Sequence, residues 1–230
     1  MTTIPGNLQH VRARIATACQ RAGRGVEEVT LLAVSKTFGA DAVRAAAAAG
    51  QRAFGENYIQ EGVDKIAALR DLGLTWHCIG TIQSNKTRLV AEHFDWVHTV
   101  DRLKIAERLS AQRPADRPPL NVCIQVNIDG GANKSGVAPG EALALARAVA
   151  ALPQLKLRGL MSIPEIAPDF EAARAVHAGA RALFDQLNAD GLGLDTLSMG
   201  MSDDLEAAIA AGSTMVRIGT AIFGSRAPKP

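Results

Sequence analysis

Short apolar runs alternate along the chain with stretches in which apolar residues recur at helical spacing. Eight short runs predict strands, because they are too short for helices and lack a polar face. These predicted strands cover residues 30–36, 53–57, 75–81, 96–100, 121–128, 155–163, 195–201 and 214–223. The stretches that predict helices, several of them Ala-rich with charges on one side, cover residues 40–49, 57–71, 84–93, 102–112, 139–151, 169–189 and 203–211. Every predicted strand except the last is therefore followed by a helix.

A further helix is predicted before the first strand, over residues 7–22, where Leu8, Val11 and Ile15 recur at helical spacing and Gly23 provides a stop. Strands that alternate with helices build parallel sheets through right-handed crossovers, and eight such units close into a barrel. The predicted fold class is therefore α/β, a single (β/α)8 TIM barrel with an extra N-terminal helix.

A doubly wound open sheet is the structural alternative. Such a sheet normally carries a glycine-rich turn after its first strand, and "SKTFGA" at residues 35–40 does not match GxGxxG. No internal repeat or linker divides the chain, and the proline-rich residues 112–120 are predicted to be a loop. The barrel is the preferred interpretation.

Composition narrows the functional classes. Lys plus Arg number 25 and Asp plus Glu 23, without a basic run, so a dedicated nucleic-acid binder is not expected. The cysteines Cys19, Cys78 and Cys123 form no CxxC pair and no histidine stands at metal-ligand spacing, so we expect buried thiols and no metal. The N-terminus lacks a signal-peptide pattern and no segment reaches membrane-span length, so a soluble cytoplasmic protein is expected.

A lysine stands where the apolar run of the first strand stops, in "LLAVSKTFG" at residues 31–39. Lys36 is thus predicted to lie at the carboxyl end of a buried strand. Burial disfavours the charged form of an ammonium group and lowers its pKa, so a lysine in this position needs a partner.

The ends of the last two strands carry features that suit an anion. After the seventh strand, Ser202 or Asp203 can cap a helix that begins near Asp204, and after the eighth Gly219 and Thr220 offer a bare backbone and a hydroxyl. Taken singly, Ser202 is as well explained as a helix cap and Gly219 as a close-packing glycine. Together, beside a lysine on the neighbouring first strand, they favour a phosphorylated ligand held near Lys36.

Arg217 lies two residues before Gly219 and therefore points to the same side of its strand. A guanidinium stays charged and only donates hydrogen bonds, so its partner must be an acceptor. A ligand atom and a carboxylate from a neighbouring strand are both possible partners.

Several segments carry a resemblance to a known family. They are "LLAVSKTF", "FGENYIQE", "WHCIGTIQSNK", "RGLMSIP" and "LSMGMSDDLEAAIAAGSTMVRIGTAIFG". In this order, and over nearly the whole chain, they resemble the signature blocks of the YggS/PROSC family of pyridoxal phosphate homeostasis proteins. The resemblance implies one barrel domain over residues 1–230, similar to the N-terminal domain of alanine racemase, that binds pyridoxal 5′-phosphate (PLP) as a Schiff base.

The resemblance also implies roles for individual residues. Lys36 would form the Schiff base, Arg217 would contact the pyridine nitrogen, and Asn57 would line the ring pocket. The phosphate would be held by Ser202, Gly219 and Thr220, and the ring pocket would also be lined by Met199 to Met201.

The expected function is that of a PLP carrier with little or no catalysis, a monomer that supplies apo forms of PLP-dependent enzymes. A PLP-dependent racemase and a Schiff-base aldolase of the barrel class are the alternatives. Arg217 argues against an aldolase, which needs no group at a pyridine nitrogen. A racemase needs two acid–base groups on opposite faces of the cofactor. Tyr58, the sole tyrosine, is predicted at a helix start with its hydroxyl in water, and the chain ends at Pro230 soon after the eighth strand.

Other polar residues receive structural interpretations. His77 is predicted to be a hydrogen-bonded core histidine, and residues 83–86, "QSNK", a turn and helix cap. Lys134 is expected in a solvated loop, although a second lysine at the rim could accept PLP during transfer. Asp203 and Asp204 are expected in the first turn of a helix, where the dipole favours carboxylates.

Overall fold

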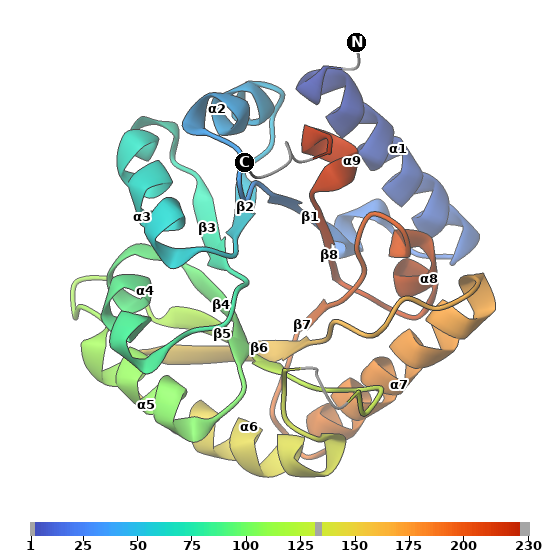
Figure 1. Cartoon of the computed structure of the whole chain (residues 1–230). Coiled ribbons are helices and arrows are strands. Elements are labelled where there is room, and N and C mark those ends of the chain that lie inside the picture. The colour runs from blue at the N-terminus through green and yellow to red at the C-terminus, as the bar shows by residue number, and fades with distance from the viewer. Residues whose placement is uncertain (1–2, 132–134, 226–230) are drawn as a thin grey trace.

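Eight parallel strands pair in chain order and close on one another, with β8 hydrogen-bonded to β1 (Figure 1). The computed structural model describes residues 3–131 and 135–225. The strands are β1 (Thr30–Val34), β2 (Ala53–Glu56), β3 (Thr75–Cys78), β4 (Trp96–Val100), β5 (Leu120–Gln125), β6 (Leu155–Met161), β7 (Thr196–Ser198) and β8 (Met215–Ile218). The predicted barrel is confirmed, and the open sheet is excluded because β1 and β8 pair through four residues each.

Helices surround the barrel, as Figure 1 shows from one end. They are α1 (Ile4–Arg21), α2 (Ala40–Ala48), α3 (Ile59–Ala68), α4 (Thr87–His93), α5 (Leu103–Gln112), α6 (Ala142–Ala150), α7 (Phe170–Ala189), α8 (Leu205–Ala210) and α9 (Thr220–Phe223). Short 3-10 turns cover Val26–Glu28, Arg70–Leu72, Ser84–Lys86 and Pro139–Glu141. The proline-rich segment predicted as a loop lies between the end of α5 at Gln112 and the start of β5 at Leu120.

The N-terminal helix α1 completes the outer ring. It begins at Ile4, after the N-cap Thr3, and buries one face that includes Leu8, Val11 and Ile15. It packs against α2, α8 and α9, next to the strands where the barrel closes (Figure 1). Among the described residues the short α9 is the one helix after β8, and α1 supplies a long helix for this part of the ring.

The end of the eighth strand differs from the prediction. A strand was expected over residues 214–223, with no helix after it, whereas β8 ends at Ile218 and residues 220–223 form α9. Gly219 departs from extended geometry, with ψ of −74°, and turns the chain into this helix. Ile222 and Phe223 are buried, so the segment is apolar enough to imitate a strand, and periodicity does not separate the two over so few residues.

Side chains of the strands alternate between two packing environments. Outward residues such as Phe54 and Val216 join the large core between strands and helices. Leu32, Val34, Ile79 and Met215 form a separate small cluster within the barrel. The rest of the interior is partly polar and includes His77, His98, Ser198 and Arg217, all buried. Polar atoms in a barrel interior need partners, and their arrangement defines the site described below.

The cysteines Cys19, Cys78 and Cys123 are buried and unbonded, as expected, and burial raises the pKa of Cys78 and Cys123 to about 12. No helix in the described ranges is long and apolar enough to cross a membrane. Over the same ranges, no three His, Cys, Asp or Glu side chains lie close enough together to hold a metal ion.

Candidate active site at the mouth of the barrel

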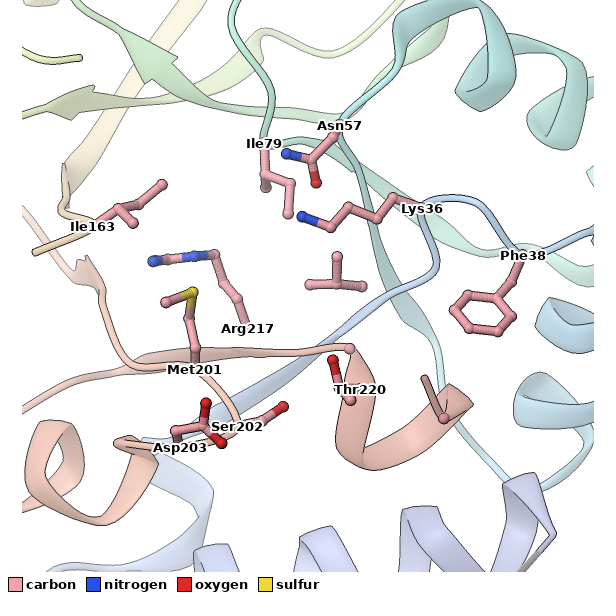
Figure 2. Close-up of a pocket in the computed structure, with 13 residues that line it drawn as sticks. Lys36, Phe38, Asn57, Ile79, Ile163, Met201, Ser202, Asp203, Arg217 and Thr220 are labelled. Atoms are coloured by element: carbon pink, nitrogen blue, oxygen red, sulfur yellow. The ribbon is translucent and has the colours of Figure 1, made fainter. Parts of the chain in front are cut away.

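A cavity of about 210 Å³ opens where the carboxyl ends of β1, β2, β7 and β8 meet (Figure 2). It is lined by Val34, Lys36, Phe38, Asn57, Ile79, Ile163, Met201, Ser202, Asp203, Arg217, Gly219, Thr220 and Gly224. A second cavity of about 230 Å³ shares Asn57, Ile79 and Ile163 with it and has Thr81, Thr99, Gln125 and Ser135 in its wall. Pockets for drug-sized ligands usually span roughly 300–1,000 Å³, so the first cavity suits a ligand the size of one substituted ring.

Lys36 reaches the cavity because of strand alternation. Leu32 and Val34 point into the barrel, and Lys36 lies two residues beyond the end of β1, on the same side. Its half-buried side chain extends into the cavity, and Figure 2 shows the amine facing the space between Asn57 and Arg217. The predicted position at a strand's carboxyl end is confirmed.

Two hydroxyl groups lie together on the side of the cavity formed by the ends of β7 and β8. Ser202 and Thr220 both line it, and Figure 2 shows them close to each other across from Lys36. Ser202 Oγ accepts a 3.4 Å hydrogen bond from the N–H of Ala221, which joins the two loops. Gly219 directly precedes Thr220 and also lines the cavity, and a Cβ on it would stand 3.2 Å from the Val34 carbonyl oxygen. Gly219 thus has both suggested features, close packing and a place in the cavity wall.

Arg217 is buried with neutral partners. Its Nη1 donates to Ser198 Oγ at 2.8 Å and its Nη2 to the Ser162 carbonyl at 2.9 Å. Among the residues that the structure describes, no carboxylate accepts a hydrogen bond from it, so the alternative of a strand-to-strand ion pair is not observed. Burial lowers the pKa of the guanidinium to about 10, which still leaves it charged at neutral pH. The guanidinium therefore lines the cavity with neutral hydrogen-bond partners, and the charge of Asp204 acts on it without a hydrogen bond.

A chain of hydrogen bonds supports Arg217 from inside the barrel. Ser198 Oγ lies 2.9 Å from His98 Nδ1, and His98 Nε2 lies 2.9 Å from His77 Nδ1, whose ring stacks on Trp96. Burial lowers the pKa of His77 to about 3 and that of His98 well below 6.5. Both imidazoles are therefore neutral, and His77 is the hydrogen-bonded core histidine that the sequence predicted.

Asn57 presents an acceptor that has no partner within the described residues. Its Oδ1 is buried and makes no hydrogen bond there, and Figure 2 shows the amide beside the Lys36 amine. Its backbone fits closely against Gly80, where a Cβ would lie 2.0 Å from the Asn57 carbonyl oxygen. A buried orphan acceptor costs free energy unless a ligand supplies a donor, so this atom indicates a binding position.

The methionine segment after β7 corrects one prediction. Met199 is fully buried in the outer core and is absent from the cavity wall, whereas Met201 lines the cavity. Ser198 points into the barrel, so the next residue points outward towards the helices. Gly200, with φ of +95°, then turns the chain so that Met201 reaches the mouth.

The two acidic residues that follow Ser202, Asp203 and Asp204, lie in different environments. Asp203 lines the cavity and is not the N-cap of α8, and neither is Ser202. Asp204 occupies the N-cap position, where its Oδ1 accepts from the Met201 N–H at 2.6 Å and its Oδ2 lies 2.9 Å from His177 Nε2. Burial acts to raise the pKa of Asp204, but these hydrogen bonds outweigh it and the pKa is lowered. The predicted helix start was one residue too early.

The other polar candidates lie away from the first cavity. Tyr58 is the N-cap of α3 and is half exposed, as expected for a helix-start residue. Gln83 precedes a 3-10 turn, Ser84–Lys86, that leads into α4, and Thr87 Oγ1 donates to the Ser84 carbonyl. This agrees with the predicted turn. Lys134 lies outside the described residues.

Sequence reasoning missed a buried ionic cluster directly behind Lys36. Lys65 of α3 lies within hydrogen-bond distance of Glu56, at the end of β2, and of Glu61 on its own helix. Burial is the largest influence on Glu56 and raises the pKa of its carboxyl. The spacing of Glu61 and Lys65 predicts an ordinary surface pair. The better signal was Glu56 within "AFGEN", because a carboxylate in a buried strand requires a partner.

Comparison with known protein families gives one match that covers nearly the whole chain. The family described as "Alanine racemase, N-terminal domain" matches residues 6–227. The chain is 63% identical over 226 residues to the "Pyridoxal phosphate homeostasis protein" of Pseudomonas aeruginosa, covering 98% of this chain and 97% of that protein. It is 59% identical over 236 residues to the protein of the same name from Escherichia coli, covering 98% of each.

Solved structures agree with these matches. PipY from Synechococcus elongatus is 40% identical, and its structure with PLP bound has a TM-score of 0.80 over 91% of this chain and 100% of that chain. The alanine racemase of Corynebacterium glutamicum shares the fold at 21% identity, with a TM-score of 0.65 over 96% of this chain and 62% of that one.

Proposed function

The chain belongs to the family of pyridoxal phosphate homeostasis proteins, and on this premise we propose that it binds pyridoxal 5′-phosphate at the mouth of the barrel. The relatives carry this role in their names, and the PipY structure holds PLP. The observation in this chain that carries the proposal is one cavity shared by Lys36, the hydroxyl pair and a guanidinium whose hydrogen-bond partners are neutral. We propose that the whole chain acts as one cofactor-binding domain.

The residues present fit the parts of PLP. The Ser202 and Thr220 hydroxyls can donate to phosphate oxygens, with Gly219 keeping the wall between them open. Arg217 can donate a hydrogen bond to the pyridine nitrogen. This nitrogen would then serve as an acceptor for the side of the guanidinium that lies towards the cavity. The buried Asn57 amide lies beside the ring position. These assignments use five of the residues inferred from the sequence and leave out Met199.

Lys36 would supply the covalent contact in this proposal, because a neutral amine condenses with an aldehyde and releases water. The role of the protein is to hold the Lys36 amine in the cavity with the hydroxyl pair on the opposite side. Phosphate binding and covalent capture then act on the same ligand.

We propose a carrier with little or no catalysis. A charged guanidinium at the pyridine nitrogen cannot give up its proton there, so the ring stays a weak electron sink for carbanion chemistry. Racemisation also needs a second acid–base group opposite the lysine. Tyr58 is half exposed at the start of α3 and does not line the cavity.

The test of the binding site is borohydride reduction of the purified, PLP-loaded protein followed by peptide mapping. We expect a stable label on Lys36, and Lys36→Ala should lose both the label and the yellow colour while retaining the fold. The matched control is Lys86→Ala, because Lys86 lies in the 3-10 turn and outside the cavity wall. Label on another lysine, or none, would contradict the assignment.

Catalysis is tested separately, by incubating the loaded protein with L-alanine in deuterated water. We expect neither α-deuteration nor D-alanine at rates near the ~10 per second median of ordinary enzymes. Turnover at that rate would replace the carrier by the racemase alternative. A colourless protein that forms a borohydride-stable bond with a sugar phosphate would instead support an aldolase.

We further propose that the protein is a cytoplasmic monomer that passes PLP to apo forms of PLP-dependent enzymes. Unbonded, buried cysteines suit a reducing compartment. Mixing the loaded protein with an apo-enzyme in the presence of a PLP scavenger separates direct transfer from release into solution. Light scattering gives the oligomeric state.

A further inference from the structure

The backbone on both sides of Lys36 is held by one helix, α3. On the preceding side, the Ser35 carbonyl accepts a 2.7 Å hydrogen bond from Lys65 Nζ. On the following side, the Thr37 N–H donates to Glu61 Oε1 at 2.7 Å. Lys36 is therefore bracketed by two contacts from residues one helical turn apart.

The Lys65 ammonium is fully used by these contacts. It is 5% exposed and donates to Ser35 O, to Glu56 Oε1 at 2.8 Å and to Glu61 Oε1 at 2.6 Å. An ammonium has three N–H donors, so none is left for another partner. Lys65 also lies between two carboxylates, so its side chain is held within this cluster and away from the cavity wall.

Thr37 shows that the segment is constrained. Its φ is +70°, a left-handed conformation that is unfavourable for a β-branched residue. Such strain persists only where surrounding contacts enforce it, and it commonly marks a functional segment. Two contacts hold it here: Glu61 fixes the N–H of the strained residue itself, and the Phe38 N–H donates to the Ser35 carbonyl across the turn at 3.0 Å.

The buried carboxylate of Glu56 ties the cluster to the barrel. Glu56 Oε1 accepts from the Ser35 hydroxyl at 2.5 Å as well as from Lys65. Glu56 ends β2, the strand paired with β1, so the two strand ends and α3 form one unit. The turn that carries Lys36 cannot shift without breaking several buried hydrogen bonds.

From these contacts we infer that Glu61 and Lys65 are positioning residues, which fix the turn after β1 so that the Lys36 amine faces the bound aldehyde. The inference rests on the proposed function and deepens it. Neither residue lines the cavity, so both act through the backbone of Lys36.

The experiment compares two ligands. PLP binding includes the covalent bond, whereas 4′-deoxypyridoxine 5′-phosphate carries the same ring and phosphate without an aldehyde. We expect Glu61→Ala to weaken PLP binding about tenfold or more, since misplacing a reacting group by about 1 Å can cost 10²-fold. Binding of the deoxy compound should stay within about twofold of the parent, because the phosphate and ring contacts are untouched.

Two variants serve as controls for Glu61→Ala. Glu61→Gln keeps an oxygen for the Thr37 N–H and should restore most of the PLP affinity. Asp64→Ala removes an exposed carboxylate from the same helix, one that bonds to Gln60 and not to the Lys36 turn, and should leave both affinities unchanged.

A further variant covers the case in which Glu61→Ala does not fold. Glu61→Asp keeps a carboxylate on the exposed side of α3, so it should fold, but its side chain is one methylene shorter and no longer reaches the Thr37 N–H. We expect PLP affinity to fall severalfold with no change for the deoxy compound.

The outcomes separate the two proposals. If Glu61→Ala or Glu61→Asp binds PLP like the parent, or if either loses both ligands equally, the positioning role is wrong. If the parent protein binds neither ligand, the proposed function fails instead.

Discussion

Arg217 combines a large desolvation cost with partners that are all neutral. The Ser198 hydroxyl and the Ser162 carbonyl satisfy two of its nitrogens, and the histidine pair behind Ser198 is neutral as well. The positive charge is therefore compensated within the described site only in part. In the proposed complex, an acceptor atom of the ligand would complete the arrangement and offset part of the cost of burying this arginine.

The contribution of a single hydroxyl group to PLP affinity should depend on the charge of the oxygen to which it donates a hydrogen bond. Removing one hydrogen bond to a charged oxygen costs about 1.5–3 kcal/mol. Ser202→Ala and Thr220→Val should therefore each weaken PLP binding by roughly tenfold to a hundredfold. Equilibrium titration followed by absorbance measures this directly.

Pyridoxal, which lacks the phosphate, provides the control for this prediction. It should bind much more weakly than PLP to the parent, and the two substitutions should change its binding little. If both variants bind PLP like the parent, the phosphate lies elsewhere.

At the scale of elements, α1 forms hydrogen bonds with both segments that carry the hydroxyl pair, the residues after β7 and helix α9. Arg14 donates to the Ser202 carbonyl at 3.0 Å and forms a two-contact ion pair with Glu206 of α8. Asn7 donates to the Ile222 carbonyl of α9 at 2.9 Å. The helix therefore supports the side of the cavity formed by Ser202 and Thr220, as well as covering the barrel.

The apolar face of α1 should contribute strongly to stability. Leu8 is fully buried, and Leu→Ala substitutions in cores cost roughly 2–5 kcal/mol of unfolding free energy. Leu8→Ala should show a loss in this range in urea unfolding. Gln9→Ala, at the adjacent exposed position, should stay within about 0.5 kcal/mol of the parent. Equal effects of the two substitutions would mean that α1 does not hold the ring closed.

At the scale of the whole molecule, the neutral histidines make stability depend on pH. Burial lowers the pKa of His77 to about 3, while an unfolded chain titrates its histidines near 6.5. Between these values the unfolded state binds a proton that the folded state does not. The free energy of unfolding therefore falls as pH falls below about 6.5, by about 1.4 kcal/mol per pH unit for this one group.

Other buried groups modify this dependence in known directions. His98 adds to it, because its pKa is also lowered, whereas Glu56 opposes it just above pH 4.5, because burial raises its pKa. The contribution of His77 is measured by urea unfolding of the parent and of His77→Gln between pH 5 and 6.5, from the slope of the unfolding free energy against pH. We expect a shallower slope for His77→Gln, and identical slopes would show that His77 is charged in the folded protein.

The sequence by itself determined the order of strands and helices and which end of the barrel carries the site. Strand and helix periods depend on neighbours a few residues apart, so they are visible in the chain. Parallel strands place all their carboxyl ends together, so Lys36, Ser202, Arg217 and Thr220 could be assigned to one mouth. The short apolar segment of α9 was mistaken for strand because local pattern does not separate the two states at that length.

Only the tertiary structure decided which side chains meet. Met199 was assigned to the cavity from its neighbours, but the alternation set by Ser198 turns it outward. Glu61 and Lys65 have the spacing of a surface pair, yet closure of β1 against β2 places Glu56 and the turn after Lys36 beneath them. Contacts between residues distant in sequence depend on how strands close and helices settle, because the free energy of such contacts comes from burial, which no local spacing encodes.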